Sequence, residues 1–324
     1  MRSRLHVVAA LALAALLPFT PAAAQDFPRK PVKIIVPFPP GGTPDMLSRL
    51  LAQRATQILG QQVIVDNRPG AGGNVAMDLV SRAPADGHTL IMGTVSTCSV
   101  NEFIFKGLTY NVERDFVPLM EVGRISNLLA VHPSLPVNSV KDLVALAKAK
   151  PGTLTYATSG YATTLHLTAE LFESSAGIQI RHVPYKGSAL AVTALVAGEV
   201  NFMFDNMPTI AQQAAAGKVR PLAVTGPKRS KLFPNVPTMQ EAGYKDLVVQ
   251  PWFGLLAPAK VPPAVLAKLN AVFNEAMRDP TVLKRFSEID LQPVGGSGAD
   301  FQKLIRAEAQ KWGKLVREKN ITAE

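Results

Sequence analysis

Residues 36–45 read VPFPPGGTPD, and this stretch decides the fold. It follows a β-branched apolar run at 32–36 that is typical of a buried strand, and a helical pattern begins at Pro44. Its two glycines lack a Cβ, so a ligand can approach the backbone amides of the turn. Thr43 suits the N-cap of the helix and Pro44 its first position. Because a helix N-terminus presents free N–H groups and partial positive charge, the stretch predicts a carboxylate site; an ordinary, well-capped turn is the alternative.

Strand and helix patterns alternate along the rest of the chain. The expected strands are 32–36, 63–65, 89–93, 127–131, 154–157, 178–183, 200–204 and 222–225. The expected helices are 44–59, 74–82, 139–150 with Ser139 as its cap, 163–175, 188–197, 263–277 and 299–319. This alternation predicts an α/β protein with mixed, mostly parallel sheets covered by helices on both faces.

The length of 324 residues predicts two lobes. The strand–helix pattern restarts near residue 126, and the two long amphipathic helices at the end of the chain need a sheet to cover. We therefore expect the chain to cross to a second lobe near residue 125 and to return near residue 248. Lobe 1 is then 25–125 plus 248–324, lobe 2 is 126–247, and the two crossovers form a hinge.

Residues 1–24 have the pattern of a cleavable signal peptide. Arg2 and Arg4 supply a positive start, residues 5–17 form an apolar stretch too short to span a bilayer, and small residues precede Gln25. No cysteine stands directly after the apolar stretch, so a lipid anchor is not indicated. No Arg-Arg pair precedes the stretch, so a twin-arginine export route is not indicated either. We expect export to the periplasm, with cleavage near Ala24.

The formal net charge of +10 is a weak indication of anionic partners, and a basic soluble surface is the alternative. Nucleic acid is not an expected partner, because aromatic residues make up 6% of the chain and the basic runs are short. Cys98 is the only cysteine, so no intramolecular disulfide can form, and we expect it to be a buried thiol. We expect a monomer.

Ligands of open α/β sheets bind beyond the carboxyl ends of the strands. Four further loops at such ends carry glycine, hydroxyl or carboxyl groups: 94–97, 157–166, 182–188 and 204–206. All four loops are candidates for ligand contacts, and the four hydroxyls within 158–164 could surround a polar ligand. We expect a structural role for His166 and a solvent-facing Lys186. Asp205 is either a ligand contact or a cap for the turn that follows it.

Several sharper motifs are absent from the sequence. Residues 70–75 follow a strand, but Val75 stands where the third glycine of a dinucleotide fingerprint belongs. There is no GxxxxGK[ST] loop, no GxSxG elbow and no HExxH or other compact metal spacing. We therefore expect no cofactor and no metal.

Together, the motifs resemble those of the substrate-binding proteins of tripartite tricarboxylate transporters, the Bug receptors. The matching stretches are 30–32, 35–42 with Asp45, 66–74, 85–90, 147–152, 182–187 (HVPYKG), 203–205, 234–238 with 241–243, and 252–255 (WFGL). Each stretch is weak alone, but the set follows the family's order over nearly the whole chain after residue 24.

The resemblance implies a type II periplasmic-binding-protein fold that closes on a carboxylate without catalysis and delivers it to a membrane transporter. Carried over by position, it implies ligand contacts from Phe38, Gly41, Gly42, Thr43 and Asp45 in lobe 1, and from Thr158, Ser159, Gly160, Thr163, Tyr185, Gly187 and Asp205 in lobe 2. To these we add Ser96 and Thr97 from the loop at 94–97.

The sequence departs from the family pattern at Tyr161 and Ala162, where a small or polar residue and then glycine are usual. Tyr161 is expected to narrow the cleft or to stack on the ligand. Two alternative functions remain open at this point. One is a ligand sensor that feeds a signalling kinase, and the other is an exported hydrolase that uses Cys98 or Ser159 with a histidine.

Overall fold

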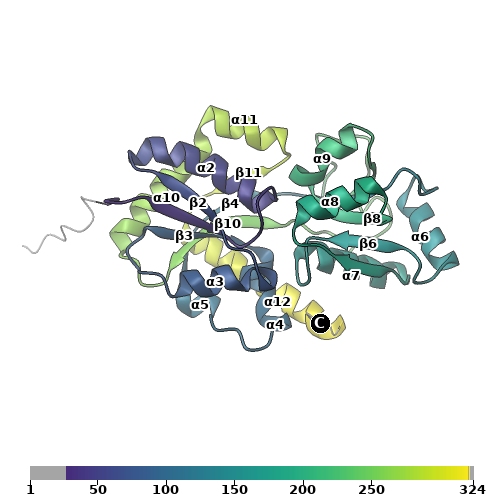
Figure 1. Ribbon diagram of the computed structural model, residues 1–324, viewed down its shortest axis with the longest axis horizontal. Helices are drawn as coiled ribbons and strands as arrows, with labels where there is room; N and C mark the ends of the chain where they lie inside the picture. The colour runs from purple at the N-terminus through teal and green to yellow at the C-terminus, as the bar shows by residue number, and fades with distance from the viewer. Residues whose placement is uncertain (1–26, 320, 322–324) are drawn as a thin grey trace, which may run out of the picture.

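The computed structural model describes residues 27–319 and 321, so the signal-peptide prediction lies outside the described residues. Two lobes lie side by side, each built on a sheet with helices on its faces (Figure 1). In the described part of the chain, no helix combines the length and the apolar character needed to cross a membrane.

The larger sheet has six strands in the order β11-β4-β10-β3-β1-β2. These strands are β1 (Val32–Val36), β2 (Val63–Asn67), β3 (Thr89–Thr94), β4 (Phe116–Arg124), β10 (Trp252–Pro258) and β11 (Gln292–Gly295). Strand β1 pairs in parallel with β2 and β3, whereas β10 runs antiparallel to β3 and β4. The C-terminal part of the chain thus inserts a strand into the middle of a sheet that the N-terminal part begins.

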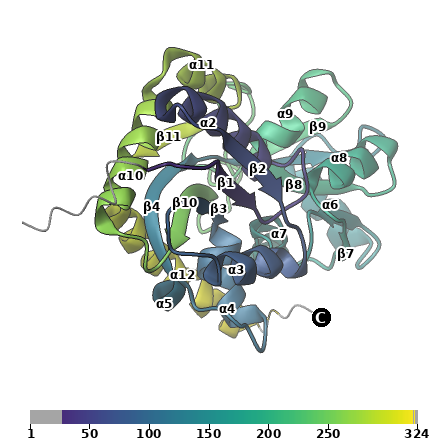
Figure 2. The same cartoon turned by 60° about the vertical axis from the view of Figure 1, so that its left-hand side comes forward.

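Helices cover both faces of this sheet. They are α2 (Thr43–Leu59), η3 (Ala71–Gly73), α3 (Asn74–Ser81), the π-helical turn η4 (Ser96–Val100), α4 (Asn101–Ile104), α5 (Val112–Asp115), α10 (Pro263–Arg278), α11 (Pro280–Glu288) and α12 (Gly298–Lys319). Figure 2 shows α2, α10 and α11 on one side of the sheet and α3, α4 and α12 on the other. Because side chains alternate along a strand, Val32, Ile34 and Val36 face the first group and Ile35 faces the second.

The smaller sheet has five strands in the order β7-β6-β8-β5-β9. They are β5 (Asn127–Val131), β6 (Thr155–Thr158), β7 (Arg181–Pro184), β8 (Phe202–Asn206) and β9 (Arg220–Val224). The helices of this lobe are α6 (Val140–Ala149), α7 (Thr164–Ala176), α8 (Ser188–Ala197) and α9 (Met207–Ala215). Helices α6 and α7 bury one face of the sheet, and α8 and α9 bury the other.

The two-lobed α/β class is confirmed, but the balance of strand directions differs from the expected one. Within the described residues, four strand pairs are parallel and five are antiparallel. The difference arises at the strands next to the crossovers. β5 pairs antiparallel with β8 and β9, and the returning β10 pairs antiparallel with both of its neighbours.

Two chain segments connect the lobes, and hydrogen bonds join them. The first, residues 125–126, runs from β4 to β5, and the second lies within 225–251. The amide of Ile125 donates to the carbonyl of Pro251 at 3.0 Å. The buried hydroxyl of Thr225 accepts from the amide of Asn127 at 2.9 Å and donates to the carbonyl of Val249 at 2.6 Å. One side chain therefore ties both connections together.

Replacing Thr225 by valine should lower the free energy of unfolding by about 2 kcal/mol, because two buried backbone groups lose their partner. Thr225→Ser keeps the hydroxyl and is expected to cost less than half as much. Urea unfolding followed by circular dichroism measures both variants. Equal losses for valine and serine would show that the methyl group, rather than the hydroxyl, stabilises the junction.

Candidate functional site

A narrow cleft between the lobes, here called the polar cleft, has a volume of about 40 Å³. A cavity needs roughly 10–15 Å³ to hold one water, so the cleft has room for about three non-hydrogen atoms, the size of a carboxylate group. Its lining residues are Phe38, Pro39, Gly42, Thr43, Pro44, Thr94, Val95, Ser96, Ser159, Thr163, Thr164, Leu165, Gly187, Ser188, Asn206, Pro251, Trp252 and Phe253. None of these side chains carries a formal charge.

The loop between β1 and α2 forms the lobe 1 wall of the cleft. Gly41 has φ +85°, a left-handed conformation that favours glycine. Its amide donates to Oδ2 of Asp45 at 3.0 Å, so the carboxylate closes the turn from inside the helix. Gly42, rather than the expected Thr43, is the N-cap of α2, so Thr43 and Pro44 are its first two helical residues. The amides at the start of α2 are thereby left free for a ligand.

Asp45 belongs to a brace behind this loop. Arg49 forms an ion pair with it at 2.9 Å and also donates to the side chain of Asn67 at 3.1 Å, and Asn67 in turn donates to the carbonyl of Phe38 at 3.0 Å. Burial acts to raise the pKa of Asp45, but hydrogen bonds from Arg49 and Gly41 outweigh it, so the pKa lies below its usual value. The carboxylate of Asp45 therefore stays charged, and its partners are Gly41 and Arg49 of the protein rather than a ligand.

Lobe 2 aims the N-termini of three helices at the cleft. Thr163 caps α7, with its hydroxyl accepting from the amide of His166 at 3.4 Å. Gly187 caps α8 with φ +106°, and Asn206 caps α9. All three cap residues line the cleft. Together with α2, four helix N-termini from two lobes surround one small space, an arrangement that favours a bound anion.

The two lobes touch at the cleft. The amide of Thr164, in the first turn of α7, donates to the hydroxyl of Ser96 at 3.2 Å. A Cβ on Gly187 would lie 3.2 Å from Cγ of Pro39, and its φ of +106° favours glycine, so glycine suits this close approach of the two walls. The two lobes are therefore in direct contact across the cleft.

Three buried polar atoms of cleft-lining residues lack a partner among the described residues. They are the hydroxyl of Thr43, a residue with 0% exposure, the side-chain oxygen of Asn206, at 8%, and the indole N–H of Trp252, at 1%. Because an unpaired buried polar group is costly, the two oxygens are suited to a polar ligand that enters the cleft. The hydroxyl of Thr43 can donate a hydrogen bond to a ligand oxygen. The side-chain amide of Asn206 can do so when it is rotated by about 180°, which places its NH₂ group where the oxygen lies.

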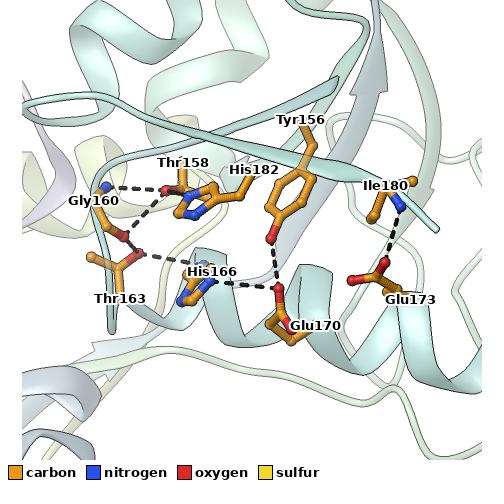
Figure 3. A network of polar contacts seen from close by, with 9 residues as sticks. All are labelled: Tyr156, Thr158, Gly160, Thr163, His166, Glu170, Glu173, Ile180 and His182. Atoms are coloured by element: carbon orange, nitrogen blue, oxygen red, sulfur yellow. Dashed lines mark hydrogen bonds and ion pairs between the residues drawn. The ribbon is translucent and has the colours of Figure 1, made fainter. Parts of the chain in front are cut away.

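A stack of aromatic rings supports the 158–163 loop from behind (Figure 3). The rings of His166 and His182 stack with centroids 4.4 Å apart, and Tyr156 stacks on His182 at 4.9 Å. His182 Nε2 lies 2.6 Å from the hydroxyl of Thr158, and Glu170 accepts from the hydroxyl of Tyr156 at 2.7 Å. Burial, together with the neighbouring His166, lowers the pKa of His182 to about 3.

His166 shares this environment. Burial lowers its pKa, and Glu170, 3.5 Å from Nε2, opposes the shift in part. Both rings are therefore neutral at pH 7 and act as packing and hydrogen-bonding groups. The structural role expected for His166 agrees with this geometry.

A second cavity, the aromatic vestibule, adjoins the polar cleft and has a volume of about 580 Å³. It is lined by Pro37, Phe38, Pro39, Pro69, Gly70, Ala71, Gly72, Gly73, Phe105, Ser159, Gly160, Tyr161, Thr163, Tyr185, Lys186 and Gly187. Five of these residues also line the polar cleft: Phe38, Pro39, Ser159, Thr163 and Gly187. The two spaces are therefore neighbours that share part of their walls.

The structure brings most of the predicted site residues to these two spaces. Phe38, Gly42, Thr43, Ser96, Ser159, Thr163 and Gly187 line the polar cleft. Gly160, Tyr161 and Tyr185 line the vestibule. Five others lie behind the walls: Gly41, Asp45, Thr97, Thr158 and Asp205.

These five residues bond to the protein itself. The hydroxyl of Thr97 lies 3.3 Å from that of Thr94, and Thr158 is bonded to Gly160 and His182. Oδ1 of Asp205 accepts from the hydroxyl of Ser188 at 2.9 Å and from the amide of Asn206 at 2.7 Å. They shape the loops whose other residues face the cleft.

Sequence reasoning missed several lining residues. Ser188 and Asn206 belong to loops that it considered, but it singled out their neighbours. Trp252 and Phe253 come from β10, whose WFGL motif supported the family resemblance without being assigned to the site. Their position just after the second crossover is the signal that would have placed them at the junction of the lobes.

The groups needed by the hydrolase alternative are not set up for catalysis. Burial raises the pKa of Cys98 to about 12, so its thiol stays protonated, and the residue is 3% exposed. Among the described residues, Ser159 makes no hydrogen bond to a histidine, and no group of three metal-binding side chains occurs.

Comparison with known proteins places this geometry in context. The sequence model of the family described as "Tripartite tricarboxylate transporter family receptor" matches residues 47–321. Protein BugT of Bordetella pertussis (strain Tohama I) is 37% identical over 299 residues, which span 92% of this chain and 92% of BugT.

Two solved structures are similar over their whole length. R. palustris Rpa4515, solved with adipate, is 38% identical with a TM-score of 0.88, covering 91% of this chain and 99% of its own. MatC from Rhodopseudomonas palustris, solved with bound malate, is 29% identical with a TM-score of 0.85, covering 90% of this chain and 100% of its own.

Proposed function

Because the chain belongs to the tripartite tricarboxylate transporter receptor family, as its motifs predicted, we propose that it is a periplasmic receptor that captures a small organic carboxylate and delivers it to a tripartite transporter. The likeness to solved periplasmic binding proteins confirms the expected fold. Rpa4515 and MatC, which were solved with adipate and malate, support a carboxylate as the ligand class here. Export through a signal peptide cleaved near Ala24 and a monomeric state are part of the proposal.

One observation carries this function: four helix N-termini, one from lobe 1 and three from lobe 2, surround a carboxylate-sized space without a charged side chain in its walls. Free amides and hydroxyls bind a carboxylate by hydrogen bonds and by the partial positive charge of the helix ends. Because the groups come from both lobes, an anion bound between them favours the closed form by its higher affinity for that form.

The moving bodies in this proposal are residues 25–125 with 248–324, and residues 126–247. They hinge where the two connections lie together, at Ile125 and Pro251. The closed form presents both lobes in one fixed arrangement, which a membrane partner can distinguish from the open form.

A ligand screen tests the proposal. The mature protein is titrated with malate, adipate, citrate and aromatic monocarboxylates by calorimetry, with glucose and glycerol as controls that carry no carboxylate. We expect at least one acid to bind with micromolar or tighter affinity, and small-angle scattering to show a smaller radius of gyration when it is bound. Binding of glucose or glycerol in preference to every acid would refute a carboxylate receptor.

Ser96→Ala should weaken ligand binding by about fivefold, because it removes a hydrogen bond of about 1 kcal/mol made only in the closed form. Ser99→Ala is a matched control from the same turn, since that hydroxyl donates to Ile305 O within lobe 1. Calorimetry gives the affinity, and scattering gives the open fraction without ligand. The same loss of affinity in both variants would indicate general damage to the turn rather than a weaker closed form.

A further inference from the structure

The aromatic vestibule differs in character from the polar cleft it adjoins. Two aromatic side chains from each lobe line it: Phe38 and Phe105 from lobe 1, Tyr161 and Tyr185 from lobe 2. Its walls are mostly apolar, and Lys186, which is exposed, is the one charged side chain in its described lining. The vestibule therefore offers apolar surface to a ligand and few polar partners to a second or third carboxylate.

The glycine loop at 70–73 brings the two phenylalanines to the vestibule wall. A Cβ on Gly72 would lie 3.0 Å from Cζ of Phe105, so this ring packs directly against the glycine backbone. A Cβ on Gly73 would lie 3.7 Å from Cζ of Phe38. The glycine loop at 70–73, which does not match a dinucleotide fingerprint, therefore packs against the rings of Phe38 and Phe105.

Tyr161 forms part of the facing wall. Its ring makes edge-on contacts with His182 at 4.9 Å and with His166 at 5.7 Å, so the histidine stack fixes its position. At 39% exposure it nevertheless remains open on the vestibule side. A large ring that is held in place yet left uncovered suits contact with a flat apolar group.

We infer that the ligand is a monocarboxylic acid with an apolar body the size of an aromatic ring, its carboxylate in the polar cleft and its body in the aromatic vestibule. This inference rests on the proposed function. The volumes permit it, because about 40 Å³ holds one carboxylate and about 580 Å³ has ample room for a ring with its substituents. Malate and citrate are small and highly charged, and would leave the aromatic walls uncovered while bringing further carboxylates to a lining in which, among the described residues, Lys186 is the one charged side chain.

Calorimetry with benzoate, phenylacetate and 3-phenylpropionate, compared with malate, adipate and citrate, tests the ligand class. We expect the best aromatic acid to bind at least about tenfold more tightly than the best of the other three, as an aromatic contact and its buried area allow. Tighter binding of malate, adipate or citrate would overturn this inference and leave the carboxylate receptor intact. Binding of none of the six acids would count against both.

Variants of the wall locate the ring. Phe105→Ala and Tyr161→Ala should each weaken binding of the best aromatic acid about tenfold and change malate binding less than twofold. Tyr161→Phe keeps the ring and should behave as wild type. Lys218→Met, at an exposed lysine of lobe 2 that lines neither cavity, is the control and should leave binding of the aromatic acid unchanged. Unchanged affinity in both alanine variants, or the same tenfold loss in Lys218→Met, would overturn the assignment of the apolar body to the vestibule.

Discussion

Gly42→Val is expected to weaken ligand binding by on the order of a hundredfold while leaving the fold intact. Gly42 has φ −83° and ψ 167°, an extended backbone that any residue adopts. A Cβ there would meet no atom closer than 3.7 Å, so the folded chain has space for it. That space is the polar cleft, where a branched side chain would displace the carboxylate at a cost of about 3 kcal/mol.

Gly42→Ala provides a graded control, because one methyl group blocks less of the cleft; about a tenfold loss is expected. Calorimetry with the best acid from the screen measures both variants, and thermal unfolding without ligand checks the fold. The unfolding midpoint of each free variant should lie close to that of the wild type. If Gly42→Val bound the acid within threefold of wild type, the carboxylate would not lie against this loop.

The elements that sequence reasoning predicted well are those with strong local signals. Strand β1 and helix α8 have the predicted bounds, 32–36 and 188–197. The helix expected after Ser139 is observed as α6, with the Ser139 hydroxyl accepting from the amide of Asp142 at 3.1 Å. Here a regular apolar period and a cap act together within one stretch of chain.

Strand β10 was not predicted because its stability comes from distant partners. It lies between β3 and β4, and its third residue, Gly254, is poor in strand propensity. A Cβ at Gly254 would lie 2.2 Å from Cζ of Phe301, so the glycine makes room for a ring on α12. Strand β11, with the sequence QPVG, is short and lies at the sheet edge, where a local pattern is weak.

In the site, sequence reasoning found the loops but not the direction of each polar group. Asp45 and Asp205 stand beside helix N-termini, where a carboxylate can accept either from a ligand or from the backbone. Both accept from backbone amides, of Gly41 and Asn206 respectively. Whether such a carboxylate binds a ligand or a backbone amide depends on the conformation of the turn, because its oxygens can accept hydrogen bonds from either.

Asp205→Asn should stabilise the protein by about 3 kcal/mol at pH 8, and the gain should shrink toward zero as the pH falls to 4. Burial raises the pKa of Asp205 from 3.8 to about 7, against the hydrogen bonds from Ser188 and Asn206 to Oδ1. Within the part of the chain that the structure describes, its buried Oδ2 has no hydrogen-bond partner. The charged form is therefore poorly solvated, and an uncharged asparagine of the same shape avoids the cost.

The pKa of Asp205, about 7 in the folded protein and 3.8 ordinarily, sets the direction in which its contribution to stability changes with pH. Between pH 3.8 and 7 the folded protein keeps a proton on Asp205 that the unfolded chain has lost. The stability from this group is complete below pH 3.8 and is lost as the pH rises through 7. Three pKa units correspond to about 4 kcal/mol, and the positive ends of α8 and α9 offset part of that cost.

His182 acts in the opposite direction. Its pKa is about 3 in the folded protein and 6.5 ordinarily, so its contribution is complete above pH 6.5 and is lost as the pH falls toward 3. In the wild type the two slopes oppose each other between pH 3.8 and 6.5. Without Asp205, the histidine slope stands alone, and the variant should lose stability on acidification more steeply than the wild type.

Urea unfolding at pH 4.5 to 8.5 in steps of about one unit measures this difference, since groups common to both proteins cancel. Asp246→Asn, at an exposed carboxylate of lobe 2, is the control and should differ from wild type by less than about 0.5 kcal/mol at every pH. The prediction would be contradicted if the difference in free energy of unfolding between Asp205→Asn and the wild type were constant with pH, or if the variant were less stable at pH 8. Either result would mean that the charged carboxylate is well solvated behind the cleft, most simply by water on Oδ2, and that the site carries a fixed negative charge next to the anion it binds.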